Sequence, residues 1–474
     1  MGKQEKEIYR NELANSQMTI KEAKLPVIVI IEGWAAAGKG SVLGGLIKYM
    51  DPRFFKVYNM DVKREDDSRH PFLYRYAVKM PKAGQFTFYD GSYCDELTKL
   101  YVEDKISEKE FSRRIQEIND YERSLRDNGY LVLKFFLDID KKTQSKRIEK
   151  LLSSKDTKWR VTDADIKQNA KYGKYRKAFM KFMSETDTGV APWYEIYADD
   201  KDDTERFLAN TITSRIEAAV KNPWVPAIPE TETVDISLKD YPLDDKVFPE
   251  DKYKETLDAL QKELKKLHNK LYRKRIPVII AYEGWDAAGK GGNIKRIASA
   301  LDPRGYEVFP IASPTDEEKN RHFLWRFWNR LPRSGHVAVF DRTWYGRVMV
   351  ERIEGFCSEN DWKRAYREIN EFEKSLVDDG ALIIKFWVQI DKDTQFERFT
   401  LRQNTPEKQW KITDEDWRNR EKWDQYESAI DEMLQKTSTD YAPWFVLESN
   451  DKKYARIKAL RILIDEIERR LDED

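Results

Sequence analysis

The sequence predicts two copies of a parallel α/β fold, and three observations support this prediction. The segment EGWAAAGKG at 32–40 returns as EGWDAAGKG at 283–291. Apolar runs without alternation, such as PVIVII and YLVLKFFLDI, are typical of strands buried on both faces of a parallel sheet. Charged segments with helical apolar spacing, such as residues 107–125, lie between these runs, and alternating strands and helices build sheets that helices cover.

The repeat keeps one register over about 160 residues. Gly33 matches Gly284 and Trp193 matches Trp444, so the offset is 251 positions throughout. A match of this length without a gap indicates a duplicated domain rather than a short-period solenoid. We therefore predict domains at 1–222 and 251–474, joined by a Pro-rich and Asp-rich linker at 223–250.

Within the second copy the predicted elements follow in order. Five leucines at helical spacing, from Leu257 to Leu271, predict a first helix that packs through one face. The run PVIIAY predicts the first strand, which is followed by a glycine-rich loop and a helix. Val337 to Phe340 predict a further strand that ends at Asp341, and ALIIKFWVQI predicts the next one. Residues 402–420, rich in charge and tryptophan, are typical of a helical lid that closes over phosphates.

Composition excludes several classes of protein. The 474 residues carry 85 Lys and Arg against 85 Asp and Glu, and this zero net charge argues against a general nucleic-acid coat protein. The 14 Trp, 24 Tyr and 22 Phe argue against disorder, and the apolar runs are too short to cross a membrane. Two cysteines, Cys94 and Cys357, and the polar start MGKQEKEIYR lead us to expect a cytoplasmic protein without a secretory signal.

The glycine-rich loop of the second copy has the chemistry of a phosphate-binding loop. Gly284, Gly289 and Lys290 satisfy the pattern G-x-x-x-x-G-K between a predicted strand and a predicted helix. Glycines let backbone N–H groups converge on phosphate oxygens, and the lysine adds a mobile positive charge. Gly291 replaces the usual Ser or Thr, so the loop lacks the ordinary hydroxyl ligand for Mg²⁺. A glycine turn without phosphate is the alternative.

Two aspartates predict a metal ion at this loop. Asp286 would repel a phosphate by several kcal/mol at an effective dielectric constant of about 20, unless a cation lies between them. Asp341 ends a predicted strand beside the loop, where a Walker B aspartate holds Mg²⁺. We predict both as Mg²⁺ ligands, with Asp286 alternatively polarising the attacking oxygen or serving only as an exposed loop residue.

Basic residues are dense in the second copy, as a phosphate-rich substrate requires. The alternative for each of them is an ordinary surface charge, as when Arg347 pairs with Glu351 four residues later. We predict phosphate contacts for Gly284, Gly289, Gly291, Arg321, Arg326, Arg330, Arg398, Arg402 and Lys411, and catalytic roles for Asp286, Lys290, Arg342 and Arg347.

The combination of these motifs resembles the polyphosphate kinase type 2 family in its two-domain class. The resemblance rests on EGWDAAGKGG, RHFLWRFWNRLPRSGHVAVFDRTWYGRV, KQWKIT, REKWDQYESAIDEML and TDYAPW, and it covers nearly the whole chain twice. It implies a P-loop kinase core with a helical lid, Mg²⁺, a basic channel and homo-oligomers. It also implies transfer of a phosphoryl group from inorganic polyphosphate to AMP, giving ADP. By motif, Asp286 would be the catalytic aspartate, Lys290 the loop lysine and Asp341 the metal-side aspartate, while Arg342, Arg347 and Arg398 would contact phosphate.

The first copy departs from this pattern at the expected site. Asp286 becomes Ala35, Arg342 becomes Gly91, Gly346 becomes Asp95 and Arg347 becomes Glu96, although Lys39 and Asp90 remain. Losing cations and gaining anions beside a polyanion site predicts that the first copy is inactive. Two alternatives stay open for the whole chain: an ATP-dependent nucleotide or small-molecule kinase, and a polyphosphate-binding scaffold without turnover.

Overall fold

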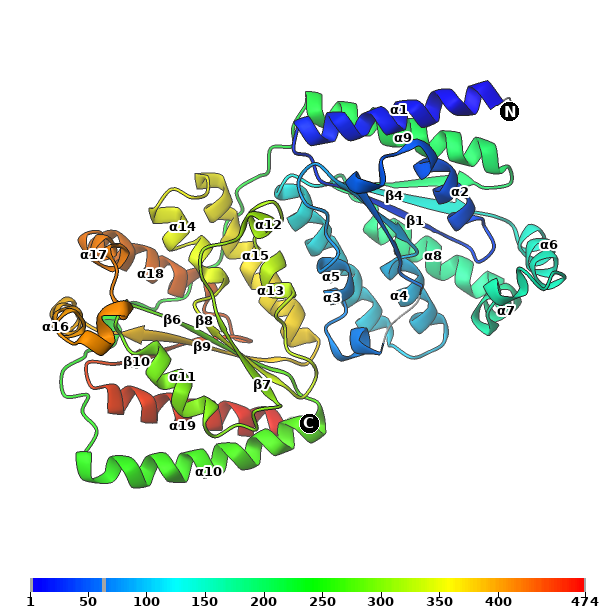
Figure 1. Cartoon of the computed structure of the whole chain (residues 1–474). Helices are drawn as coiled ribbons and strands as arrows, with labels where there is room; N and C mark the ends of the chain where they lie inside the picture. The colour runs from blue at the N-terminus through cyan, green and yellow to red at the C-terminus, as the bar shows by residue number, and fades with distance from the viewer. Residues whose placement is uncertain (1–2, 62–64, 473–474) are drawn as a thin grey trace. The chain divides into compact units, whose positions relative to one another are not determined.

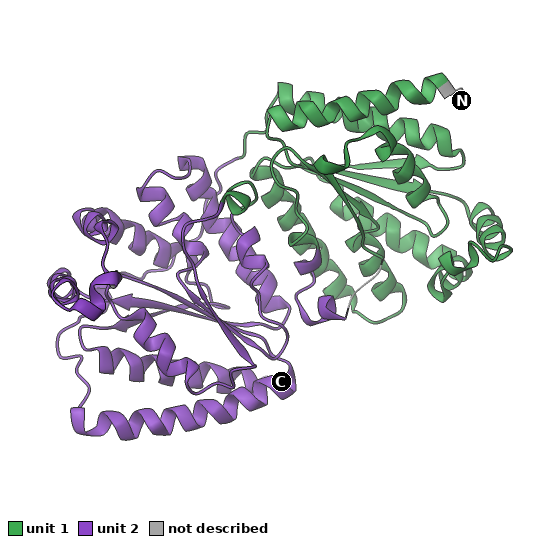
Figure 2. Cartoon of the chain, viewed as in Figure 1, with its two compact units in different colours: residues 1–64, 76–226, 316–322 green, residues 65–75, 227–315, 323–474 purple. Residues whose placement is uncertain are grey.

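The structure is a computed structural model, and it describes residues 3–61 and 65–472 (Figure 1). The chain divides into two compact units (Figure 2). Unit 1 comprises Met1–Arg64, Tyr76–Pro226 and Asp316–His322, and unit 2 comprises Glu65–Arg75, Ala227–Thr315 and Phe323–Asp474. Each unit contains one sheet of five strands, and every strand pairing is parallel.

The first half of the chain holds a sheet with the strand order β2-β3-β1-β4-β5. Its helices and strands are α1 (Lys3–Glu22), β1 (Val27–Gly33), α2 (Lys39–Leu46), β2 (Phe55–Asn59), α3 (Tyr74–Ala77), β3 (Phe86–Asp90), α4 (Tyr93–Val102), α5 (Glu108–Asp127), β4 (Leu131–Asp138), α6 (Lys141–Leu152), α7 (Asp163–Ala170), α8 (Tyr172–Thr186), β5 (Trp193–Tyr197) and α9 (Lys201–Lys221). Short 3₁₀ turns are η1 (Ile47–Tyr49), η2 (Pro52–Phe54), η3 (Asp66–Arg69) and η4 (Lys158–Arg160).

The second half repeats this order as β10-β9-β6-β8-β7. Its elements are η5 (Leu238–Asp240), α10 (Glu250–Lys274), β6 (Val278–Gly284), α11 (Lys290–Ala298), β7 (Tyr306–Pro310), α12 (Asp316–Lys319), α13 (Trp325–Trp328), β8 (Val337–Asp341), η6 (Trp344–Arg347), α14 (Val350–Ile353), α15 (Glu359–Asp378), β9 (Leu382–Gln389), α16 (Lys392–Gln403), η7 (Pro406–Lys411), α17 (Asp414–Glu421), α18 (Trp423–Thr437), β10 (Trp444–Glu448) and α19 (Lys452–Asp472).

Strand register shows that the duplication extends to the fold. Val27 of β1 lies opposite Phe86 and Leu131, and Val278 of β6 lies opposite the residues 251 positions later, Val337 and Leu382. Every residue of β4 and β9 is buried, as their continuous apolar runs predict. Helices α10, α11 and α19 cover one face of the second sheet, and α15 and α18 cover the other (Figure 1). The prediction of a duplicated parallel α/β fold is confirmed.

The predicted helices form where the spacing places them. Residues 107–125 lie within α5 and its N-cap, and Leu264, Leu267 and Leu271 are the buried stripe of α10. The lid segment at 402–420 is helical in three pieces: the end of α16, the turn η7 and the short helix α17. Pro406 cannot donate to a continuing helix, and Thr413 caps a new helix by exchanging hydrogen bonds with Asp416.

The segment predicted as a linker packs along the second half of the chain from residue 227 onward. The backbone N–H of Val234 donates to the carbonyl of Gln435 at 2.9 Å, and that of Leu238 donates to the Asp431 carboxylate at 2.8 Å. The N–H of Phe248 donates to Asp451 at 2.8 Å. Among residues 3–61 and 65–472, no helix combines the length and apolar character needed to span a membrane.

Candidate functional site

The loop between β6 and α11 has a backbone that requires glycine at both ends. Gly284 has φ 151° and Gly289 has φ 116°, both in the region that side chains rarely adopt. A Cβ at Gly284 would lie 2.6 Å from the carbonyl oxygen of Val388, so this position also needs the space. A Cβ at Gly291 would meet nothing within 4 Å, and residue 291 is exposed at the start of α11. The sequence therefore builds an open loop at the N-terminus of a helix.

Arg398 of α16 holds the backbone of this loop through hydrogen bonds. Its Nη1 donates to the carbonyls of Ala287 and Ala288 at 3.0 and 2.9 Å, and its Nη2 donates to those of Ser449 and Asn450 at 2.6 and 3.0 Å. Burial, together with the positive charge of Arg402, lowers the pKa of Arg398 to about 10. Its predicted phosphate contact stays a prediction, but these donors already serve the backbone, so its visible role is to position the loop.

The side chain of Lys290 folds back over the loop that precedes it in the sequence and reaches the first residues of that loop. Its Nζ donates to the carbonyls of Gly284 and Trp285 at 2.6 and 3.2 Å. The ammonium group is thus held at the open side of the loop, where a phosphate would lie.

Asp286 belongs to this loop, and its carboxylate accepts hydrogen bonds from two side chains. Arg342 Nη2 donates to Oδ1 at 3.0 Å, and Asn419 Nδ2 donates to Oδ2 at 3.1 Å. Burial opposes the charged carboxylate, but Lys290, Arg342 and the Asn419 hydrogen bond outweigh it and lower the pKa of Asp286. The Asp286 side chain is 17 % exposed and ionised at neutral pH.

Arg342 reaches Asp286 from a strained backbone position. It follows the last residue of β8 with φ 67°, a left-handed conformation that a non-glycine residue adopts at a cost of about 1–3 kcal/mol. The matching residue of the first copy, Gly91, has φ 80° and bears no such cost. Strain that persists in one copy only is a sign that the arginine side chain is needed there.

A pocket opens beside this group of charges and encloses about 590 Å³, including its open mouth. Asp286, Arg342 and Asn419 line one part of it. The rest is mainly apolar and aromatic, from Trp285, Met349, Val350, Trp387, Tyr426 and Ile430. Trp285 is fixed by a stack on Trp423, with ring centroids 3.7 Å apart. A pocket with an aromatic part and a charged part suits a molecule that is itself half ring and half phosphate.

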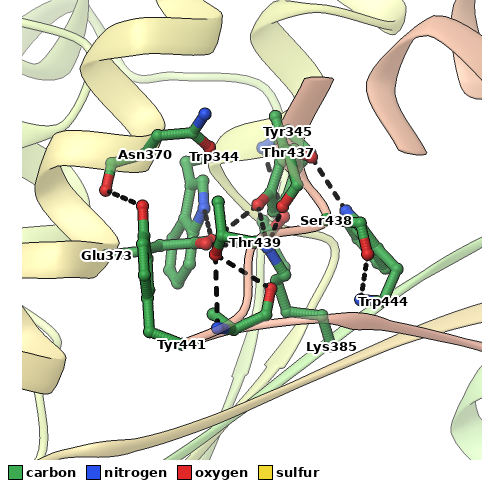
Figure 3. A network of polar contacts seen from close by, with 12 residues as sticks. Trp344, Tyr345, Asn370, Glu373, Lys385, Thr437, Ser438, Thr439, Tyr441 and Trp444 are labelled. Atoms are coloured by element: carbon green, nitrogen blue, oxygen red, sulfur yellow. Dashed lines mark hydrogen bonds and ion pairs between the residues drawn. The ribbon is translucent and has the colours of Figure 1, made fainter. Parts of the chain in front are cut away.

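A buried polar network holds the segment that carries Arg342 and Arg347 (Figure 3). Lys385 Nζ donates to Glu373 Oε2 at 2.8 Å, to Tyr345 Oη at 2.9 Å and to the Thr437 carbonyl at 2.6 Å. Glu373 Oε1 accepts from Tyr345 at 2.6 Å and from Trp344 Nε1 at 2.9 Å. The network thereby joins η6, α15, β9 and the end of α18.

Of the two aspartates predicted to bind metal, Asp341 ends β8, and Asp286 lies in the loop two residues after β6, the strand that pairs with β8. Among residues 3–61 and 65–472, no group of three or more His, Cys, Asp or Glu side chains is placed to hold a metal ion. Asp286 and Asp341 still fit Mg²⁺, because this ion is usually bound through one or two carboxylates, with phosphates and water completing its shell.

Most of the remaining predicted residues make their contacts outside the loop. Arg347 pairs with Glu351 at 2.8 Å, as the surface alternative predicts, and its guanidinium lies 4.6 Å from the centre of the Phe323 ring. Arg321 belongs to unit 1 and donates to the Met80 carbonyl at 3.2 Å. Arg326 donates to the Ala312 carbonyl at 2.9 Å, and Arg330 donates to the Arg326 carbonyl. Arg402 is half-buried on α16. The side chain of Lys411 is outside the described residues.

The sequence reasoning missed the amide side chains at the loop. Asn419 holds Asp286, and Gln395 Nε2 donates to the Asp286 carbonyl at 3.1 Å. In the first copy Gln168 takes the place of Asn419 and accepts from the N–H of Ala35 at 2.9 Å. An amide at both positions of the repeat was the available signal, but nothing in the spacing connects residue 419 to residue 286.

The corresponding site of the first copy is filled with its own carboxylates. Burial acts against the charge of Lys39, but Asp61, Glu32, Asp95 and Asp90 raise its pKa. Burial raises the pKa of Glu32 to about 8 and that of Asp95 to about 6. A Cβ at Gly91 would lie 1.9 Å from Asp61 Oδ1, so an arginine here would displace Asp61. This site opposes an anion that the second site would attract.

The chain is similar to known proteins over almost its full length. The family model described as polyphosphate kinase 2 matches residues 1–223 and 248–474. The polyphosphate:AMP phosphotransferase of Pseudomonas aeruginosa is 38% identical over 477 residues, which cover 97% of this chain and 94% of that protein. The polyphosphate:AMP phosphotransferase of Acinetobacter johnsonii is 36% identical over 458 residues, which cover 94% of this chain and 92% of that protein.

A crystal structure titled as a polyphosphate kinase 2 from Pseudomonas aeruginosa superposes with a TM-score of 0.87 at 36% identity. The superposition covers 100% of this chain and 98% of that one. Both repeats match one family model, and relatives above 30% identity span almost the full length. The chain belongs to the polyphosphate kinase 2 family.

Proposed function

We propose that the second copy transfers the terminal phosphoryl group of inorganic polyphosphate to AMP and releases ADP. The observation that carries this proposal is the joint presence of Asp286, Lys290 and Arg342 at a phosphate-binding loop whose pocket is otherwise mainly apolar and aromatic. The curated relatives that match nearly the whole chain bear the name of this activity.

The acceptor would enter the pocket beside the loop. Its lining includes edges of the largely buried rings of Trp285, Trp387 and Tyr426, which would meet the nucleoside, and Arg342, which would meet its phosphate. In this arrangement the acceptor oxygen and the donor phosphate would meet beside Asp286. Holding the two reactants in this way removes much of the entropic cost of their encounter.

The chain's own cations would stabilise the charge that spreads over the transferred group. Lys290 supplies a positive charge at the loop, and Arg342 presents a planar guanidinium that pairs with Asp286. Mg²⁺, held by Asp286 and Asp341, would neutralise the negative charge of the phosphates when it is bound. Asp286 is ionised at neutral pH, as a metal ligand must be.

The first copy would not catalyse this transfer. Its loop lacks a carboxylate at Ala35 and a guanidinium at Gly91, and Asp61 and Asp95 lie near the lysine instead. We propose that it serves packing and assembly. The expectations of a homo-oligomer, of no nucleic-acid or membrane partner and of a cytoplasmic location stay predictions.

The test is formation of ADP from AMP with Mg²⁺, in separate reactions with purified polyphosphate and with ATP as the donor. We expect ADP with polyphosphate, and a loss of about a hundred-fold or more in turnover for Asp286→Asn, since groups that stabilise transition-state charge contribute several kcal/mol. Chemical removal of Mg²⁺ should abolish turnover in the wild type. ADP with ATP alone would establish the nucleotide kinase, and binding of polyphosphate without ADP would establish the scaffold.

A further inference from the structure

A dense run of cations follows the fourth strand of the first copy. Residues 141–181 contain 14 Lys and Arg against four Asp and Glu, whereas the equivalent residues 392–432 of the second copy contain eight against eleven. The run comprises α6, η4, α7 and most of α8, all within unit 1 (Figure 1). The chain as a whole is neutral, so this excess of positive charge is a local property of the first copy.

Six exposed cations of this run form what we call the basic ridge. They extend from the first turn of α6 to the end of η4: Lys142, Lys146, Lys150, Lys155, Lys158 and Arg160. The three on α6 are four positions apart, so they share one face and follow one another at steps of about 6 Å. The buried Gln144 and Ile148 lie on the opposite face of this helix. Thr157 joins the turn to the helix, because its Oγ1 donates to the Leu151 carbonyl at 2.7 Å.

Neighbouring carboxylates do not neutralise the basic ridge. Among the residues that the structure describes, the ammonium groups of its five lysines make no ion pair and no hydrogen bond. Segment 141–160 contains two acids, Glu149 and Asp156, and within the described part of the chain neither carboxylate pairs with a cation. Arg160 lies over the ring of Trp159, 5.4 Å from its centre. The charges of the ridge therefore face solvent.

This arrangement is unfavourable for α6 itself. Its first turn holds no acid and instead carries Lys141 and Lys142, at the end of the helix where the dipole is positive. Lysines four positions apart also repel one another. At the offset of 251 the six positions of the ridge hold Asp393, Glu397, Leu401, Pro406, Gln409 and Lys411. The second copy builds the equivalent helix α16 with acids at two of these positions, so the fold does not require the cations.

We propose that the basic ridge of the first copy binds long polyphosphate chains and holds them without transferring a phosphoryl group. The choice of polyphosphate rests on the proposed function. A chain with a negative charge on every phosphate can meet several cations in succession and release their counterions. The three lysines of α6 span about 12 Å, so a long chain meets more of them than a short donor does. A chain bound here stays attached to the molecule that consumes it.

The chemistry of the ridge favours an all-phosphate chain over a nucleic acid. Its lysines are point charges, and they contribute neither a base-reading fork nor a ring. Trp159 is 72% exposed beside them, but the equivalent Trp410 of the second copy is 75% exposed without such a ridge. The ring therefore does not distinguish this surface. Transfer does not follow binding in this copy, because carboxyl groups surround the loop lysine Lys39.

Protection of lysines from acetylation locates the bound chain on the full protein without AMP, and so without turnover. Modification rates read by mass spectrometry compare the free protein with protein in long-chain polyphosphate or in tripolyphosphate. At about ten times Kd, long chains should slow the modification of Lys142, Lys146 and Lys150 about ten-fold, and tripolyphosphate should slow it less than about two-fold. Internal controls are exposed lysines in an acid-rich stretch, which should react equally throughout: Lys239, Lys252 and Lys254.

Two triple variants test the ridge by calorimetric titration with long-chain polyphosphate. Replacing Lys142, Lys146 and Lys150 with glutamine should weaken binding about ten-fold and flatten the slope of log Kd against log salt by about two, since each lost contact contributes about 0.7. The matched control replaces Lys239, Lys252 and Lys254 with glutamine, which removes the same charge, and it should bind as the wild type. Arginine at the three ridge positions should retain the affinity, because the charge remains.

Four outcomes would overturn the proposal: ridge lysines that long chains leave unprotected, equal protection of the control lysines, equal protection by tripolyphosphate, and equal loss of affinity in the two glutamine variants. Protection by poly(U) RNA but not by polyphosphate would also overturn it and assign the ridge to nucleic acid. The proposed function is tested separately. Protected ridge lysines in a protein that forms no ADP would support the ridge alone, and ADP formation with an unprotected ridge would reject only the ridge.

Discussion

Arg398 and Arg147 hold the backbone of the loop in their respective copies through equivalent hydrogen bonds. Arg147 donates to the carbonyls of Ala37 and Ala198 at 3.0 and 2.8 Å, which are the contacts of Arg398 moved by 251 positions. The planar fork of donors ties the loop to the segment after the last strand. Both copies have this arginine, although only the second is expected to be catalytic. Its presence is therefore explained by the loop backbone that it holds.

We predict that Arg398→Lys weakens both the fold and catalysis. A lysine supplies one point of donors, so it leaves at least two buried carbonyls without partners, at about 1–3 kcal/mol each. The loop that positions Lys290 and Asp286 should loosen, and kcat should fall more than KM rises. Urea unfolding and steady-state kinetics on the same samples measure the two effects.

Arg147→Lys is the matched control, because it breaks the same contacts in the first copy. It should lower the free energy of unfolding by a similar amount and leave kcat within about two-fold of the wild type. If Arg398→Lys destabilises the protein but keeps full turnover, the loop does not depend on this arginine for catalysis.

Residues of this kind mark the limit of prediction from sequence. The pattern from Gly284 to Lys290 predicts the loop, because glycines at fixed spacing have one structural use there. The contacts of Arg398 with Ala287 and Ala288 and the approach of Asn419 to Asp286 are different, because they join segments more than 100 positions apart. Their identities depend on tertiary packing, which spacing along the chain does not encode.

At the scale of elements, the network around Lys385 connects α18, the helix after the lid, to the segment 342–347. Thr437 ends α18, whose earlier residues Tyr426 and Ile430 line the pocket, and Tyr345 lies between Arg342 and Arg347. One buried ammonium group holds both. In the first copy Lys134 pairs with Glu122 at 2.7 Å and donates to the Thr186 carbonyl at 2.7 Å, but Cys94 replaces Tyr345. The ion pair is therefore shared, and Tyr93, at the position of Trp344, also donates to Glu122. Only the contact made by Tyr345 is missing from the first copy.

We expect Glu373→Gln to reduce kcat as well as stability. Breaking a buried ion pair from one side leaves an uncompensated charge and costs about 3–5 kcal/mol. It also weakens the hydrogen bonds that hold Trp344 and Tyr345, so Arg342 should lose its alignment. Turnover at saturating substrates, measured at a temperature where circular dichroism shows a folded protein, tests this.

Two further variants separate positioning from stability. Glu122→Gln should cost similar stability through Lys134, while kcat stays near that of the wild type. The double change Glu373→Gln and Lys385→Met removes the unpaired charge, so it should recover part of the stability without recovering kcat. Equal kcat losses in Glu373→Gln and Glu122→Gln would reject a specific role for the second network.

The elements themselves were largely predictable, and the exceptions have local causes. The spacing of apolar residues predicts the two sheets and the helices α5 and α10. Because the repeat has no gaps, the same pattern can be followed in both copies. The lid was predicted as helical without its breaks, although Pro406 and the cap at Thr413 are visible in the sequence. The packing of residues 234–248 on the second half was not visible, because Pro-rich and Asp-rich composition is shared by free and docked segments.

At the scale of the whole molecule, the two copies share one fold but differ in the charged side chains around their loops. The total is neutral, yet Lys39 lies near four carboxyl groups, whereas Asp286 of the second copy lies near the cations Lys290 and Arg342. A polyanion is attracted to one site and repelled by the other. Fold comparison alone could not separate the two copies, since every strand pairing is repeated at the same offset.

The division of charge predicts that the two loop lysines differ in function. Lys39 and Lys290 donate to equivalent carbonyls, Gly33 at 3.2 Å and Gly284 at 2.6 Å, so the loop backbone does not distinguish them. Transfer of a phosphoryl group requires positioned cations around it, and only the second copy has an arginine, Arg342, paired with a carboxylate of the loop. We expect Lys290→Ala to abolish ADP formation and Lys39→Ala to leave most of it. Lys39→Ala should still lower the melting temperature, because Asp61 and Glu32 lose their cation. Activity per folded protein, with folding checked by circular dichroism, makes the comparison. Comparable losses in the two folded variants would show two working centres and reject a silent first copy.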